Sequence, residues 1–97
     1  MKREDYIDIR HNLIEIFRNE LPVLRAKVRV SQETVAEKIG ISRQTYSGIE
    51  TGKRELSWTI FLALFAYFQN NVQTKQALSK IDGFEEKVVR AIEETGK

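Results

Sequence analysis

The chain has 97 residues, of which 41% are apolar and 31% are charged, and its net charge is +2. That length suits one domain with a single core, and the balance of residue types is ordinary for a soluble protein. The absence of cysteine excludes disulfides and thiolate zinc sites, and one histidine, His11, cannot supply a metal site or a catalytic pair. We therefore expect neither a metal nor a cofactor.

The beginning of the chain, MKREDYIDIR, alternates charges and lacks the apolar core of a secretion signal. The longest apolar run, residues 58–68, is too short to span a bilayer. We therefore expect a cytoplasmic protein without a membrane segment.

The first predicted helix follows from helical spacing of Leu13, Ile14, Phe17 and Leu21. Pro22 interrupts this pattern. We expect the helix to end near Asn19 and a second helix to start with Pro22 in its opening turn, where a missing N–H costs little. A continuous helix kinked at the proline is the alternative.

Residues 31–54, SQETVAEKIGISRQTYSGIETGKR, predict two short helices joined by a tight turn. Ser31 and Ser42 suit N-cap positions, and Gly40 and Gly52 can take the left-handed conformation that ends a helix. Apolar residues occur where crossing helices touch, at Val35, Ala36, Ile39, Ile41 and Ile49. This is the pattern of a helix-turn-helix, whose second helix usually enters the major groove of DNA.

The charge distribution supports a polyanion partner. Residues 21–54 contain seven basic and three acidic residues, a net charge of +4, which leaves −2 for the rest of the chain. The excess positive charge therefore coincides with the helix-turn-helix.

The C-terminal half predicts further helices. Ser57 should cap an almost entirely apolar helix over residues 58–68, and such a helix must be covered on most sides, in part by a second subunit. We expect a short helix over residues 72–80, then an Asp82–Glu85 capping box that opens a last helix from about Phe84 to Thr95, ended by Gly96.

An aromatic row on the helix over residues 58–68 is expected to lie in the core, and the opposite side to form a dimer interface. The row is Trp58, Phe61, Phe65 and Phe68, and the opposite side is Ala63, Ala66 and Tyr67.

About half of the chain, from about Leu21 to Phe68, resembles the helix-turn-helix domain of phage lambda repressor and Cro, the XRE family. The resemblance rests on a helix with Arg25, on SQETVAEKIGIS, on RQTYSGIETGKR and on the apolar helix that follows. It implies an all-α, compact bundle of about five to six helices that binds operator DNA, commonly as a dimer, and regulates transcription; some members are antitoxins. The loop GKRELSW departs from the family, because Leu56 is present where proline is frequent, and this loop is expected to pack apolarly.

We divide the chain into an N-terminal helix or arm (1–20), a DNA-binding domain (21–71) and a C-terminal helical extension (72–97). The extension should pack on the domain or on a dimer partner.

The predicted second helix of the motif carries the candidate base contacts. Gln44 can pair with adenine through two hydrogen bonds, and Arg43 can read guanine or hold a phosphate. Ser47 and Gly48 complete the outward face. Gly48 permits close approach to the groove or only relieves crowding.

Other residues are assigned supporting roles. Ser31, Thr51, Lys53 and Arg54 are candidate phosphate contacts. The resemblance implies that Gln32 touches the DNA backbone and braces the glutamine reader, and that Arg25 and Glu50 form a buried or half-buried ion pair. Tyr46 is expected to be partly buried with its hydroxyl on a partner, or else to lean on a DNA sugar or a thymine methyl.

The predicted function is a sequence-specific DNA-binding transcriptional regulator, a repressor and homodimer that inserts residues 43–51 into the major groove of double-stranded DNA. The alternative is an antitoxin-type module whose main partner is a protein toxin, with DNA binding for autoregulation. No nucleophile–base pair, phosphate loop or metal cluster indicates an enzyme.

Overall fold

The computed structural model describes residues 3–95, and side chains from residue 7 to residue 93. The described chain consists of α1 (Arg3–Val28), α2 (Gln32–Ile39), α3 (Arg43–Thr51), α4 (Trp58–Gln69), α5 (Val72–Ser79) and α6 (Phe84–Thr95). No strand occurs between residues 3 and 95, so the all-α prediction is confirmed. Gly96, the expected end of α6, lies outside the described residues.

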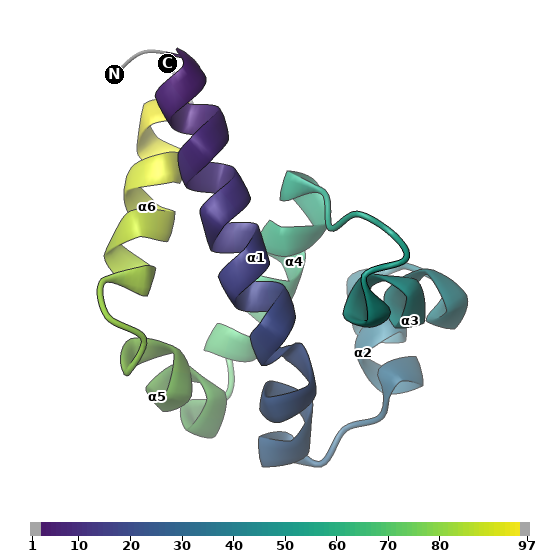
Figure 1. Ribbon diagram of the computed structural model, residues 1–97. Coiled ribbons are helices and arrows are strands. Elements are labelled where there is room, and N and C mark those ends of the chain that lie inside the picture. The colour runs from purple at the N-terminus through teal and green to yellow at the C-terminus, as the bar shows by residue number, and fades with distance from the viewer. Residues whose placement is uncertain (1–2, 96–97) are drawn as a thin grey trace.

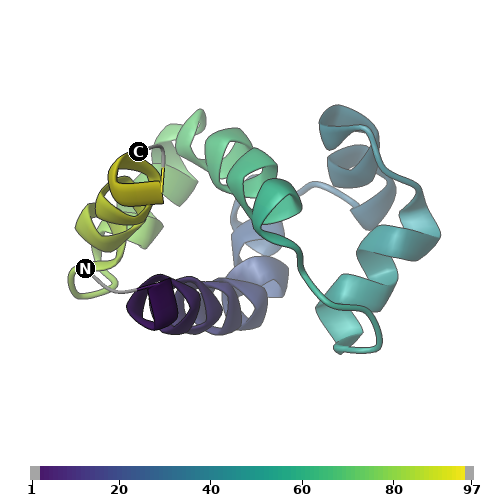
Figure 2. The same cartoon turned by 90° about the horizontal axis from the view of Figure 1, so that it is seen from above.

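The longest helix, α1, runs the length of the molecule and organises it. In Figure 1, α6 lies along its N-terminal half, and α2 and α3 lie on its other side. Seen from above, α1 and α4 separate α6 from the pair α2 and α3 (Figure 2). The site elements α2 and α3 thus form one flank of a bundle.

The expected helix break near Asn19 is wrong: α1 is continuous through Pro22, as the alternative of a kinked continuous helix requires. Pro22 lies inside α1, on its exposed side. The opposite side buries Leu13, Phe17, Leu21 and Leu24, each at most 1% exposed. Burial of each large apolar side chain contributes about 1.5–3 kcal/mol, which together exceeds the roughly 3 kcal/mol that an internal proline costs.

The predicted serine caps are confirmed. Ser31, Ser42 and Ser57 each accept a hydrogen bond from the backbone N–H three residues later, at 3.0, 3.0 and 3.2 Å. Gly40 and Gly52 end α2 and α3 in the left-handed conformation, both with φ near +81°. The ends of both motif helices were therefore predictable from capping residues in the local sequence.

The Asp82 capping box is wrong. The N–H of Lys87 donates to the carbonyl oxygen of Gly83 at 3.0 Å, which places Gly83 at the N-cap position, and Asp82 lies in the turn before it. Gly83 has a φ of +69°. The tight turn between α5 and α6 needs this conformation at its last residue, and glycine adopts it without strain.

The core is centred on Phe17 of α1, whose ring lies 5.1 Å from that of Phe61 and 6.0 Å from that of Phe84. Phe61 and Phe68 of the predicted aromatic row are fully buried, and Trp58 and Phe65 are partly buried against them. α4 packs on α1, α2 and α5 of the same chain. Leu56 is 4% exposed, so the α3–α4 loop packs apolarly as predicted.

In the part of the chain that the structure describes, no helix combines the length and apolar character needed to cross a membrane. The same residues contain no group of three or more histidine, aspartate or glutamate side chains placed to hold a metal ion.

We predict that Arg29→Gly stabilises the fold. Arg29 is the one described non-glycine residue with positive φ, at 55°, and this conformation costs about 1–2 kcal/mol for a residue with a side chain. Glycine removes that cost but also loosens the unfolded chain, so the expected gain is about 0.5–1 kcal/mol in urea unfolding.

Gly40→Ala makes the reverse change, from glycine to a residue with a side chain at a position of positive φ. Gly40 has a φ of +81° and an added Cβ would meet no atom within 4 Å, so only backbone strain should act. We expect a loss of about 1 kcal/mol. Equal effects of the two variants would contradict this explanation.

Candidate nucleic-acid interface

The outer face of α3 forms a shallow concavity of about 270 Å³. It is lined by six of the predicted site residues, namely Arg43, Gln44, Ser47, Gly48, Thr51 and Lys53. Arg43 and Gln44 are exposed at the start of the helix, as expected. One turn of helix separates Arg43 from Ser47 and Gln44 from Gly48, which is why these residues share a face.

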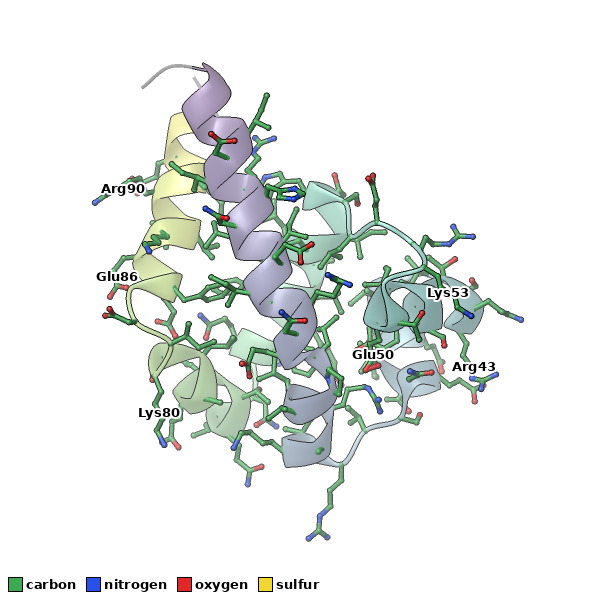
Figure 3. The ribbon with its side chains drawn as sticks, in the orientation of Figure 1. Arg43, Glu50, Lys53, Lys80, Glu86 and Arg90 are labelled. Carbon is green, nitrogen blue, oxygen red and sulfur yellow. The ribbon has the colours of Figure 1, made fainter. Side chains whose placement is uncertain are left out.

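The charge on this face is positive. In Figure 3, Arg43 and Lys53 extend away from the body of the molecule, whereas Glu50 points inward between α3 and α1. Glu86 and Arg90 of α6 and Lys80, which follows α5 as its C-cap, are also labelled there and lie on the far side. The one carboxylate of α3 is thus buried, whereas Arg43 and Lys53 are exposed.

The inward carboxylate of Glu50 holds α1, α2 and α3 together. Its two oxygens accept from Nε of Arg25 at 3.0 and 3.2 Å, and Nη2 of Arg25 lies 3.0 Å from Oε1. Nε2 of Gln32 donates to Oε2 at 2.9 Å. Glu50 is 5% exposed and Arg25 21%, so the implied half-buried ion pair is confirmed.

Arg25 also joins the loop before α2, because its Nη1 donates to the carbonyl oxygen of Val30 at 3.2 Å. Burial alone would lower the pKa of Arg25, but the hydrogen bond and the charge of Glu50 raise it above its ordinary value. The guanidinium is therefore charged at every pH at which the protein is handled.

Gln32 braces a different residue from the one implied by the resemblance. Its amide bonds to Glu50 rather than to Gln44. The partly buried Gln32 at the start of α2 is thus tied to the ion pair, and its effect on α3 passes through Glu50.

The prediction that Tyr46 contacts DNA is wrong. Its side chain is 0% exposed and lies in the core beside the Arg25–Glu50 pair. Burial is complete rather than partial, and the hydroxyl makes no hydrogen bond of good geometry, although the Arg25 guanidinium lies close enough to act on its pKa. Burial, followed by the charge of Glu50, raises the pKa of Tyr46 well above its ordinary value. The ring is enclosed because α3 turns this position toward α1.

Of the two predicted roles of Gly48, the relief of crowding is observed, because the missing side chain leaves space for Arg54. A Cβ at Gly48 would lie 3.2 Å from the Cβ of Arg54. The backbone N–H of Arg54 and the hydroxyl of Thr51 both donate to the carbonyl oxygen of Gly48, at 3.0 and 3.2 Å. The basic loop thus folds back on the end of α3. Arg54 lines the cavity toward α1 and not the α3 concavity, unlike Lys53.

Two of the candidate phosphate contacts use their hydroxyls within the protein. The Ser31 hydroxyl caps α2 and lies 2.9 Å from that of Thr34, and the Thr51 hydroxyl donates to Gly48. Both residues are exposed. The two hydroxyls therefore stabilise the start of α2 and the end of α3, whether or not they also contact a phosphate.

Residues 24–73 match the family model described as a helix-turn-helix. The chain belongs to this helix-turn-helix family, of the XRE type. The match begins in the last part of α1 and ends at the start of α5. It contains the whole α3 concavity and the Arg25–Glu50 pair, and it leaves out most of α1 and all of α6.

A curated protein of Methanocaldococcus jannaschii, named as an uncharacterized HTH-type transcriptional regulator, is 37% identical over 51 residues. The aligned part is 53% of this chain and 77% of that protein. No solved structure was matched. The family and the six-helix bundle are consistent with the lambda repressor-like fold expected from the sequence.

The residue that sequence reasoning missed at this site is Arg18. Its guanidinium lies against Gly52, the residue that ends α3, and it is bonded to Glu15 at 2.7 Å. The available signal was its position seven residues before Arg25, which places both on one face of α1.

We predict that Glu50→Ala destabilises the protein by about 3 kcal/mol, the lower end of the range for a buried pair, because Arg25 keeps some contact with water. The loss comes from the unpaired guanidinium and from the released Gln32 amide. Urea unfolding measures it, with Glu93→Ala, an exposed carboxylate on α6, as the control. A similar small loss in both variants would show that the pair does not hold the helices.

We predict that Tyr46→Phe leaves stability near neutral pH almost unchanged, because the buried hydroxyl that it removes makes no hydrogen bond of good geometry. The raised pKa keeps Tyr46 neutral in the folded state. Below about pH 10 the tyrosine of the unfolded chain is neutral as well, so this ionisation does not lower the free energy of unfolding there. Above that pH the unfolded state releases the proton, and the wild type should lose about 1.4 kcal/mol per pH unit more than the variant.

The measurement is urea unfolding of both proteins between pH 8 and 11.5. Tyr67 is present in both proteins and cancels in the comparison. Parallel stability curves would mean that the Tyr46 hydroxyl ionises in the folded protein as it does in the unfolded one.

Proposed function

We propose that this protein is a sequence-specific DNA-binding regulator of transcription, acting as a repressor, that inserts α3 (Arg43–Thr51) into the major groove. One observation carries the proposal: the polar and basic side chains of α3 and its following turn line one exposed concave face. The opposite side of α3 is locked into the core through Tyr46 and Ile49. Membership in the helix-turn-helix family and the name of the relative support the same function.

In this proposal the first turn of α3 reads bases. Gln44 pairs with adenine through its amide, and Arg43 contacts guanine or the adjoining phosphate. Both side chains are exposed and neither is engaged by a hydrogen bond or ion pair described above. Lys53, at the far end of the concavity, is placed to neutralise a phosphate.

We propose a homodimer as the DNA-binding form, because two-fold symmetry matches palindromic operators with half-sites about 34 Å apart. The candidate interface residues of α4 include Ala66, which is exposed, and Ala63 and Tyr67, which are partly exposed. Analytical ultracentrifugation with and without duplex DNA tests this assembly.

The antitoxin-type module stays the second candidate. The division into residues 1–20, 21–71 and 72–97 marks segments of the sequence, because α1 continues past residue 20 and the three segments share one core. Exposed apolar residues on α1, Ile7 at 57% and Ile16 at 39%, would suit a protein partner. Deletion of residues 1–20 cannot test it, because Leu13 and Phe17 belong to the core. Ile7 and Ile16 are nine residues apart, so they lie on opposite sides of α1 and form two separate apolar sites. The double variant Ile7→Ser, Ile16→Ser keeps the core and removes both sites. If repression of transcription persists in that variant, neither site is needed for regulation.

The test of the proposed function is selection of duplexes from a random pool, followed by titration of variants on the selected sequence. We expect a palindromic motif, and Gln44→Ala should lose about 1–3 kcal/mol of discrimination at one base pair while its salt dependence stays the same. Lys53→Ala should weaken binding to all sequences and reduce the salt slope by about 1.

Lys80→Ala is the matched control, since it removes one lysine from the far side of the molecule (Figure 3). It should change neither the motif nor the salt slope. If no motif emerges, or if Lys80→Ala weakens binding as much as Lys53→Ala, binding is general charge attraction and the proposal fails.

A further inference from the structure

We infer that Arg18 is a positioning residue for α3, and that α1 holds this helix at two points rather than one. The first point is the Arg25–Glu50 pair, which lies inside the part of the chain shared with the family. The second is the contact of Arg18 with Gly52 at the C-terminal end of α3, supplied by the part of α1 outside the family match. This inference rests on the proposed function of α3.

The two arginines occupy one face of α1. They are seven residues apart, which is about two turns of helix, so their side chains project in nearly the same direction. On α3 their contacts, Glu50 and Gly52, are two residues apart at the last turn and the cap. The middle of α1 thus reaches the end of α3 directly, where the chain turns back toward Lys53.

The contact with Gly52 is close. A Cβ at Gly52 would lie 2.6 Å from Nη1 of Arg18 and 3.8 Å from its Cζ, so the guanidinium occupies the space that any side chain would need. Gly52 is therefore required for space as well as for its φ of +81°.

Electrostatics favour this arrangement. The last carbonyl groups of a helix carry partial negative charge, and a cation beside them is stabilised. On its other side the guanidinium is held by Glu15, with Nη2 at 2.7 Å from Oε2. Arg18 is thus fixed between its own helix and the end of α3.

Arg18 is not placed to touch DNA. Its side chain is 25% exposed and lines a cavity of about 320 Å³ between α1 and the loop after α3, separate from the α3 concavity. Its effect on DNA must therefore act through α3. The buried Tyr46 and Ile49 and the Glu50 pair hold one side of α3, and the Arg18 contact adds a restraint at its C-terminal end. This added restraint limits the directions in which Lys53, just after that end, can point.

The experiment compares wild type with Arg18→Ala on the selected duplex. We expect about tenfold weaker binding, equivalent to about 1.4 kcal/mol, with an unchanged salt slope because no phosphate contact is lost. Amide hydrogen exchange should quicken at Gly52 and Arg54, whose N–H groups bond to Ile49 and Gly48. Arg18→Lys keeps the cation and should restore part of the affinity.

Arg10→Ala is the matched control. Arg10 is also a partly buried arginine of α1, but its guanidinium lies over the ring of Trp58, 4.9 Å from the centroid, and not on α3. It should leave exchange at Gly52 and Arg54 unchanged. Equal effects of the Arg10 and Arg18 variants would overturn the inference, since they would reflect general loosening of α1.

Gly52→Ala tests the contact independently of DNA. Its backbone strain is the same in both backgrounds, but only the wild type also has the collision with Arg18. We therefore expect Gly52→Ala to lower the urea midpoint more in wild type than in Arg18→Ala. If Gly52→Ala lowers the urea midpoint equally in wild type and in Arg18→Ala, Arg18 does not contact Gly52 and the inference is wrong.

The outcomes separate the inference from the proposed function. If wild type selects no duplex, the proposed function fails, and the exchange and urea measurements still decide whether Arg18 holds α3. If wild type binds and Arg18→Ala binds equally well, the positioning role fails alone. A salt slope lowered by about 1 in Arg18→Ala would make Arg18 a phosphate contact and overturn the inference.

Discussion

The carboxylate of Glu50 is the interaction on which the arrangement of the helix-turn-helix depends. It is almost fully buried and accepts hydrogen bonds from Arg25 of α1 and Gln32 of α2, while belonging itself to α3. A buried charge is costly unless its lone pairs are satisfied, so the three helices are held in the one geometry that satisfies it. The same short helix turns Tyr46 and Ile49 into the core, and this burial leaves Arg43 and Gln44 exposed.

The long helix α1 connects that contact to the rest of the fold. It packs on α3, α4, α5 and α6, and its buried face passes through the position of Pro22 without a break. The family match covers only its last part, yet Leu13 and Phe17 lie in the common core. The family motif is thus built here into a larger bundle, and the surface that faces DNA in our proposal is supported by residues far outside the motif.

Much of the site was predictable because it follows local rules. Serine caps, left-handed glycines and the one-turn spacing of Arg43, Gln44, Ser47 and Gly48 act within four residues. The wrong predictions concern residues whose structure depends on contacts with distant parts of the chain. Pro22 is tolerated because the face opposite it is buried, and Tyr46 is enclosed because α3 packs against α1. Gly83, and not Asp82, occupies the N-cap position of α6, because the turn between α5 and α6 needs a positive φ at residue 83.

The sequence by itself determined the all-α class, the two motif helices with their caps, and the polar and basic face of α3, since each depends on neighbours along the chain. It also indicated the Arg25–Glu50 pair, through the resemblance to a known family. Only the tertiary structure decided that Gln32 bonds to Glu50, that Arg54 folds over Gly48, and that Arg18 rests on Gly52. The last of these joins residues 34 positions apart. Such contacts are set by how helices pack, and no periodicity along the chain encodes the direction in which a packed helix faces.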